Sequence, residues 1–193
     1  MDVFCETERL LLRRFTEADA DDLESLDADP AVMRYINGGR PTPRQQILDE
    51  VLPRFMSYDE RHPEQGAWAA VERSRGEVIG WFALRPPEGG LADSSGPGVV
   101  ELGYRLRRSA WGKGYAAEGS RALIRKAFHE YGVRRVIAQT MTVNTASRRV
   151  MEKCGLSYVR TFFQDWPESI EGTEQGDVEY ALDRARFVQL AGY

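Results

Sequence analysis

The chain has 193 residues, 42% of them hydrophobic, and a formal net charge of −4 at pH 7. This length predicts a single domain over residues 1–193 with a substantial core. The acidic balance gives no support for nucleic-acid binding and would suit a cationic amine ligand, and the lack of a long apolar run argues against a membrane span.

The first third of the chain predicts one strand followed by helices. The run ERLLLRRF predicts a strand over Glu8–Phe15, and the N-cap and acidic residues after it predict a helix over Glu17–Leu26. Further helices are predicted over Ala31–Ile36 and Pro43–Tyr58. Pro53 lies inside the last of these and would kink the helix or end it early.

The middle of the chain changes to strand-like residues, because β-branched and aromatic side chains dominate it. Three strands are predicted, with a hairpin turn between the first two and a solvated loop between the second and third. They are Ala67–Glu72, Val78–Leu84 and Val99–Leu106, with the turn at Ser74–Gly76 and the loop over Pro86–Gly98. In the third strand, a period of two puts Glu101, Gly103 and Arg105 on one face.

The last part of the chain alternates helices and strands. A stripe of small and apolar residues predicts a long helix over Lys113–Tyr131, ended by Gly132. The remaining predictions are strands over Arg135–Thr140, Ser157–Phe163 and Asp177–Asp183, a helix over Thr145–Cys154, a polar loop over Gln164–Gly176 and a helical or ragged tail.

Cysteine and histidine usage argues against two kinds of site. Cys5 and Cys154 lie far apart, without the spacing of a zinc site or a disulfide framework, and His62 and His129 are isolated. We therefore expect no metal site and reduced thiols. The N-terminus carries acids instead of the basic and apolar segments of a secretion signal, so we expect a cytoplasmic protein.

The stretch Tyr104–Ala117 joins a strand to a helix through a turn that holds two glycines. The first backbone N–H groups of a helix have no intrahelical partners and lie at the positive end of the helix dipole. Gly112 and Gly114 lack a Cβ atom, so the backbone can take positive φ and approach phosphate oxygens closely. Lys113 and nearby arginines add positive charge. The pattern predicts a site for a ligand with two or three phosphates.

The residues of this turn allow several interpretations, which differ in the ligand that would bind. A P-loop needs Ser or Thr after Lys113, where Gly114 stands. A dinucleotide fingerprint is formally met by Gly112, Gly114 and Ala117, but the next strand ends at Gln139 without the acidic residue that would bind a ribose. Coenzyme A is a third ligand. A glycine turn that only lets the helix pack closely on the sheet explains the same residues without any ligand.

Several blocks of the chain resemble the GNAT superfamily of N-acetyltransferases, particularly the branch of ribosomal-protein-alanine N-acetyltransferases. The blocks are the opening TERLLLRRF, the strand ELGYRL, the turn WGKGYAAEG, the segment Asn144–Leu156 and the closing EYALDR. The pyrophosphate motif of the family, Gln/Arg-x-x-Gly-x-Gly/Ala, is similar to residues 111–116, except that Trp111 replaces the first residue. Because backbone amides bind the pyrophosphate, this replacement costs little.

The resemblance implies an α/β (α+β) fold, a mixed, mostly antiparallel sheet of six to seven strands with helices on both faces, and acetyl-CoA as cofactor. It implies that backbone groups of Leu106, Arg107 and Arg108 bind the pantetheine arm. It assigns the pyrophosphate to the amides of Trp111, Gly112, Lys113, Gly114, Tyr115 and Ala116. Asn144 matches the family asparagine that contacts the cofactor arm near the thiol, and helical spacing places Ser147 on the same stripe.

Acetyl transfer to an amine needs a group or a water molecule that takes the amine proton. We expect Glu101 to be this base, since a carboxylate inside a strand costs desolvation energy unless it faces a wet cleft or finds a partner. The alternative is an ion pair between Glu101 and Arg105 on an exposed face of the sheet.

The departing thiolate also needs a proton, and the source of this proton is open. Many family members use a tyrosine at the position of Met151. Ser147, Tyr104 or a water molecule could take its place, or no acid is needed because thiolate is a good leaving group. Cys154 reads as an apolar filler and not as a covalent nucleophile.

The resemblance therefore implies an N-acetyltransferase that acts on a primary amine in a ternary complex. The acceptor would be a protein N-terminus or a small amine such as an aminoglycoside or a polyamine. A catalytically silent CoA-binding regulator is the alternative. We expect acceptor recognition in residues 17–58 and in the loops 86–98 and 164–176, where Trp68, Trp81 and Trp166 could line a pocket or serve the core. A homodimer is a reasonable expectation.

Overall fold

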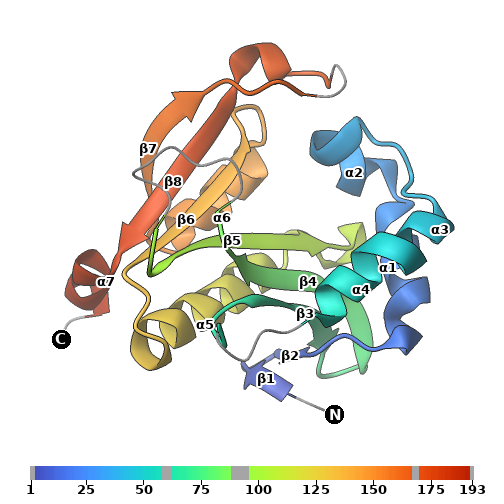
Figure 1. Ribbon diagram of the computed structural model, residues 1–193, viewed down its shortest axis with the longest axis horizontal. Helices are drawn as coiled ribbons and strands as arrows, with labels where there is room; N and C mark the ends of the chain where they lie inside the picture. Colours follow the sequence, from blue (N-terminus) through green and yellow to red (C-terminus); the bar gives the residue numbers. More distant parts are fainter. Residues whose placement is uncertain (1–2, 58–61, 88–95, 167–169, 192–193) are drawn as a thin grey trace.

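The computed structural model describes residues 3–57, 62–87, 96–166 and 170–191. Its centre is a mixed sheet of eight strands in the order β1-β2-β3-β4-β5-β6-β8-β7 (Figure 1). All neighbouring strands pair antiparallel except β5 and β6, which are parallel. The strands are β1 Val3–Glu6, β2 Leu10–Arg13, β3 Gly66–Glu72, β4 Glu77–Arg85, β5 Val99–Leu106, β6 Arg135–Met141, β7 Ser157–Phe162 and β8 Asp177–Asp183.

The helices cover the sheet in two groups, each with its own apolar core. One core contains residues from the long helix after the glycine turn and from the helix after β6, and the other contains residues from the helical segment between β2 and β3. The helices are α1 Ala20–Asp27, α2 Pro30–Asn37, α3 Arg44–Gln46, α4 Leu52–Met56, α5 Tyr115–Glu130, α6 Thr145–Lys153 and α7 Arg184–Ala191. The prediction of helices on both faces is confirmed.

The alternation predicted for β5 is also confirmed. Leu102 and Leu106 belong to the core beneath α5 and α6, with Tyr104 packed against it. Arg105 points to the opposite face, where its guanidinium carbon lies 5.3 Å from the centre of the Trp81 ring. The strand therefore carries apolar residues toward one group of helices and polar residues toward the other.

Strands β5 and β6 part from each other along their length. Their register pairs Val99 with Arg135, Val100 with Val136, and Glu101 with Ile137. Both strands are described in full, and beyond this point neither pairs with the other, although β5 continues to pair with β4 and β6 with β8. Figure 1 shows β6, β8 and β7 running in a different direction from β3, β4 and β5.

The N-terminal strand prediction was partly wrong. The strand predicted over Glu8–Phe15 is confined to β2, and a further strand, β1, precedes it and pairs with it antiparallel. Four residues such as VFCE are too short to give a clear alternation, and only pairing with β2 fixes them as a strand. This edge strand brings the sheet to eight strands instead of six or seven.

The helix predicted over Pro43–Tyr58 is distorted just before Pro53. The segment passes from α3 through a π-helical turn, Ile47–Val51, into α4, and Leu52 N–H donates to the carbonyl of Ile47, five residues back. Proline has no N–H to continue the normal ladder, so the wider turn accommodates it and the helix continues. Helix α4 ends at Met56, and Tyr58 lies outside the described residues.

The other elements agree with the predictions to within a few residues, although α5 begins at Tyr115 instead of Lys113. The predicted loop over Pro86–Gly98 falls mostly outside the described residues, as does part of the loop over Gln164–Gly176, which contains a 3-10 turn at Thr173–Gln175. None of the helices among the described residues combines the length and apolar character needed to cross a membrane.

Candidate active site

The glycine turn has the geometry of an anion site. Gly112 and Gly114 have φ values of 72° and 86°, in the left-handed region that glycine tolerates. A Cβ atom built on Gly112 would meet nothing within 4 Å, so the turn faces open space. No backbone N–H group from Gly112 to Ala117 donates to an acceptor within the described part of the chain. These donors match the oxygens of a pyrophosphate.

Arg9 and Glu118 hold this turn in place, and neither was predicted as a site residue. Arg9 donates through Nη1 to the carbonyl of Lys113 at 2.9 Å, and its Nη2 lies 2.5 Å from Glu118 Oε2. Glu118 also accepts from the Thr7 hydroxyl and from the Arg9 backbone N–H. Burial alone would raise the pKa of Glu118, but the hydrogen bonds from Thr7 and Arg9 lower it.

Two aromatic residues of the turn are also anchored. The Tyr115 hydroxyl donates to Glu72 on β3 at 2.5 Å, and the guanidinium of Arg9 lies over the Tyr115 ring. The Trp111 indole N–H donates to the carbonyl of Leu106 at 2.8 Å, while almost half of its surface stays exposed. Thus the turn is tied to the segment just before β2, to β3 and to the end of β5.

Some polar groups at the end of β5 form hydrogen bonds and ion pairs with neighbouring elements. Arg107 N–H donates to the carbonyl of Ile79, and its guanidinium contacts Asp22 at 2.8 Å. Arg108 pairs with Asp29 at 3.2 Å. Lys113 forms no ion pair among the described residues, although its charge helps to lower the pKa of Glu72.

Backbone alternation leaves other groups of β5 pointing toward β6. Because Arg107 N–H faces β4, the N–H and carbonyl groups of Leu106 and Tyr104 face the other way. At that level β6 no longer pairs with β5. These groups therefore line the edge along which the two strands part.

Asn144 and Ser147 stand at the start of α6, next to this edge. Asn144 caps the helix by accepting from Ser147 N–H, and its amide donates to the Thr140 hydroxyl at 3.0 Å. The Ser147 Oγ lies 2.9 Å from the Tyr104 hydroxyl, so α6 and β5 are joined where the strands are not. Burial raises the pKa of Tyr104 to about 12.

Two nearby residues belong to the core. Met151, at the position where the resemblance implies a tyrosine, is 2% exposed and packs in the core beneath α5 and α6. Cys154 is also buried, and desolvation raises the pKa of its thiol to about 11. Both cysteines are free thiols. Cys154 is therefore neutral near pH 7 and unsuited to act as a nucleophile.

Glu101 is the last residue of β5 that pairs with β6, so it lies where the strands begin to part. Its side chain is 6% exposed, and it forms an ion pair at 2.7 Å with Arg85, its partner in the β4 register. The alternative of an exposed pair with Arg105 is wrong, because Arg105 pairs instead with Asp27 at 2.5 Å.

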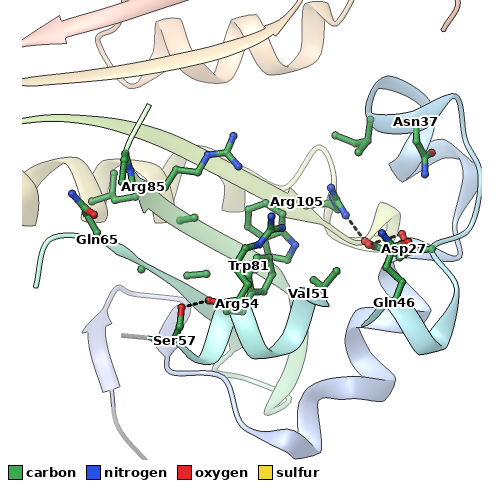
Figure 2. Close-up of a pocket in the computed structure, with 18 of the residues that line it drawn as sticks. Asp27, Asn37, Gln46, Val51, Arg54, Ser57, Gln65, Trp81, Arg85 and Arg105 are labelled. Atoms are coloured by element: carbon green, nitrogen blue, oxygen red, sulfur yellow. Dashed lines mark hydrogen bonds and ion pairs between the residues drawn. The ribbon is translucent and has the colours of Figure 1, made fainter. Parts of the chain in front are cut away.

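A pocket of about 500 Å³ opens on the same face of the sheet as Glu101. Figure 2 shows its polar residues, which come from α1, α2, α3, α4, β4 and β5 and from connecting segments. Trp81 lines this pocket, whereas Trp68 lies in the core on the other face and stacks on Phe4. His62 is also part of the lining, and its side chain is 54% exposed.

The arrangement thus places an anion site, a parting of two strands and a pocket around one region of β5. Sequence reasoning missed Arg9, Glu118 and the arginines of the pocket. Arg9 and Glu118 lie within two of the quoted sequence blocks, TERLLLRRF and WGKGYAAEG, which was the available signal. Among the pocket arginines, Arg105 lies within the quoted block ELGYRL, whereas Arg54 and Arg85 lie outside the quoted blocks and come from separate elements.

Comparisons with known proteins identify relatives over most of the chain. A family model described as acetyltransferase (GNAT) domain matches residues 9–157. A protein of Aspergillus fumigatus named FsC-acetyl coenzyme A-N(2)-transacetylase is 37% identical over 166 residues, which cover 86% of this chain and 69% of that protein.

Solved structures share the fold. A GNAT-family acetyltransferase from Bacillus anthracis matches with a TM-score of 0.75 and 23% identity, over 96% of this chain and 99% of the other. An aminoglycoside acetyltransferase solved in complex with coenzyme A matches with a TM-score of 0.70 and 21% identity, over 94% of this chain and 99% of the other.

Proposed function

Since the chain belongs to the GNAT acetyltransferase family, we propose that this acetyl-CoA-dependent N-acetyltransferase transfers the acetyl group to a primary amine by direct attack in a ternary complex. The acceptor would be a protein N-terminus or a small amine. One observation carries the proposal: the parting of β5 and β6 leads from the glycine turn, at one end, to Glu101 and the pocket at the other.

The cofactor would bind through backbone groups for the most part. The N–H groups of Gly112 to Ala116 would hold the pyrophosphate, with Lys113 compensating its charge. The outward-facing N–H group of Leu106 would hydrogen-bond the pantetheine arm along the free edge of β5, beside the Leu106 carbonyl that accepts from Trp111. Arg107 and Arg108 would support the site through their contacts with Asp22 and Asp29, which fix the end of β5.

Acetyl-CoA supplies an activated thioester, and the residues of this chain would supply orientation and proton transfer. Glu101 would take the amine proton, directly or through a water molecule, from the face on which the pocket opens. Asn144 would position the cofactor arm near the thiol, since it stands at the start of α6 beside the free edge. Ser147, hydrogen-bonded to Tyr104, would protonate the departing thiolate.

The test is a thiol-release assay with acetyl-CoA and a panel of primary amines, followed by initial-rate measurements at varied concentrations of both substrates. Intersecting reciprocal plots are expected for a ternary complex. Parallel plots, or an acetylated protein isolated without acceptor, would contradict direct attack.

A catalytically silent CoA-binding regulator is the second candidate, and the burial of Met151 in place of a catalytic tyrosine favours it. The two candidates differ in one measurement. Calorimetry would detect acetyl-CoA binding in both cases, whereas only the enzyme would release thiol with some member of the amine panel.

A further inference from the structure

Small residues on β3 and β4 form part of the pocket floor, and the same row of the sheet continues onto β5. Ala67 on β3 pairs with Ala83 on β4, and Ala83 pairs with Gly103 on β5. On the same face, the neighbouring row on one side holds Arg85 and Glu101, and the neighbouring row on the other holds the pair Trp81 and Arg105. The three rows form a shallow channel with large polar walls.

The two walls are separated by a known length of strand. Glu101 and Arg105 are four residues apart on β5, which corresponds to about 13 Å between their Cα atoms. Gly103, between them, has no side chain, and the Trp81 ring lies over it, with Cζ3 3.7 Å from where a Cβ atom of Gly103 would be. The pocket of about 500 Å³ that Arg85 and Arg105 line therefore has room for a small molecule, and Glu101 lies beside it as the ion-pair partner of Arg85.

The charged residues of the pocket are mostly arginines. Arg54, Arg85 and Arg105 line it, and Asp27 is the acidic residue among the lining residues that the structure describes. Arg85 is balanced by Glu101, and Arg105 is balanced by Asp27. Figure 2 shows the contact between Arg105 and Asp27 at the end of the pocket near α2.

Asp27 is not available to a cationic ligand. Its side chain is 4% exposed, its Oδ1 contacts Arg105 and its Oδ2 accepts from the Thr42 hydroxyl at 3.1 Å. Both carboxylate oxygens therefore serve the fold. The acid that a polyamine would need at this end of the pocket is absent from the described lining residues.

Two arginines retain hydrogen-bonding capacity. Arg54 has no carboxylate partner among the described residues, and its guanidinium carbon lies 5.7 Å from the Phe55 ring. The Nε atom of Arg105 is buried and has no hydrogen-bond partner. Buried donors of this kind usually have an acceptor, and a planar guanidinium suits a carboxylate particularly well.

From these contacts, we propose that the acceptor is an amine that also carries a carboxylate or similar oxyanion, held by Arg54 and Arg105 while its amine lies toward Glu101. The inference rests on the proposed function and narrows it, because it disfavours polyamines and other purely cationic acceptors. The overall negative charge of the chain does not oppose it, since the local field of the pocket acts on the bound ligand.

The test compares amines that differ only in a carboxylate. Calorimetry of the CoA-saturated protein would measure the binding of lysine against cadaverine, and of phenylalanine against phenethylamine. In at least one pair the carboxylated member is expected to bind about tenfold or more tightly. A panel in which no carboxylated member binds more tightly than its partner would overturn the inference.

Arg54→Gln tests whether Arg54 binds the carboxylate of the acceptor. The variant is expected to fold, because Arg54 is exposed and has no carboxylate partner among the described residues. The variant is expected to weaken binding of the carboxylated amine about tenfold and to leave its partner unchanged, with Arg54→Lys intermediate. The control is Arg75→Gln, in the turn between β3 and β4 and away from the pocket, where an exposed arginine forms only a long ion pair of 3.9 Å with Glu77. An unchanged preference in Arg54→Gln would refute the assignment.

The binding measurement needs no turnover, so the two proposals fail separately. A protein that prefers carboxylated amines but releases no thiol would contradict the proposed acetyl transfer alone. A protein that acetylates amines but binds cadaverine and lysine equally tightly would contradict the proposed substrate class and not the acetyl transfer.

Discussion

The hydroxyl of Tyr104 on β5 lies 2.9 Å from Oγ of Ser147 on α6. This hydrogen bond joins two elements that are not joined by the sheet, since β5 no longer pairs with β6 at Tyr104. The hydrogen bond therefore lies beside the free edge of β5, where we propose that the cofactor arm binds. The two hydroxyl groups share one hydrogen-bond proton.

If Ser147 protonates the thiolate with Tyr104 orienting it, the two residues act as one unit. Tyr104→Phe and Ser147→Ala are each expected to lower kcat about tenfold, and the double variant is expected to lose no more than either single variant. Steady-state kinetics of the four proteins measures this coupling, and additive losses would show that the residues act independently.

The pKa of about 12 at Tyr104 predicts a feature of the pH profile. A group titrating that high stays protonated throughout the working range, so Tyr104 is expected to cause no change in kcat between pH 7 and about 10. Profiles of wild type and Tyr104→Phe would test this. An alkaline limb that disappears only in the variant would assign a lower pKa to the tyrosine.

Replacement of Glu101 tests the proposed base. Glu101→Gln keeps the size of the side chain but removes the proton acceptor, and kcat is expected to fall by about 10²–10⁴ with acetyl-CoA affinity unchanged. The rates are compared across a range of pH, and calorimetry gives the affinity. Full activity of the variant at every pH would rule out Glu101 as base.

The glycine turn can be tested with an internal control. Gly112→Ala adds a Cβ atom toward open space at φ 72°, and Gly76→Ala does the same at φ 70° in the turn between β3 and β4. Both should lose similar stability, about 1–2 kcal/mol, because the backbone strain is alike. Gly112→Ala and Gly114→Val should weaken acetyl-CoA binding, whereas Gly76→Ala should not, as measured by calorimetry. Equal affinities in all these proteins would contradict pyrophosphate binding at the glycine turn.

Acid should loosen the turn through Glu118. Its folded pKa lies below the ordinary value of 4.5, so the carboxylate stabilises the fold above about pH 4.5, and this contribution is lost as the pH falls through the folded pKa. Denaturant unfolding of wild type and Glu118→Gln would measure it. The difference in the free energy of unfolding is expected to be constant above pH 5 and to shrink below pH 4.5. A difference in the free energy of unfolding that grows as the pH falls would contradict the lowered pKa of Glu118.

Cys154 provides a check on direct attack. Its buried thiol has a pKa of about 11, so Cys154→Ala is expected to keep kcat within about twofold and to lose stability through the smaller side chain. Loss of turnover in a folded Cys154→Ala protein would instead favour an acetyl-cysteine route.

The sequence by itself determined the features that depend on neighbouring residues. Gly112 and Gly114 predicted a turn with positive φ because only local sterics decide that conformation, and the alternation of β5 placed Glu101 and Arg105 on one face for the same reason. The quoted sequence blocks then predicted the family and its cofactor.

Contacts between distant parts of the chain were decided only by the tertiary structure. Arg9 and Glu118 lie 109 positions apart, and nothing local to either predicts their pairing. The partner of Glu101 proved to be Arg85 across the β4 register, and a protein with net charge −4 proved to line its pocket with arginines. The charge of a pocket depends on which side chains the fold brings together. The net charge of the chain sums over all residues and does not show where each charge lies.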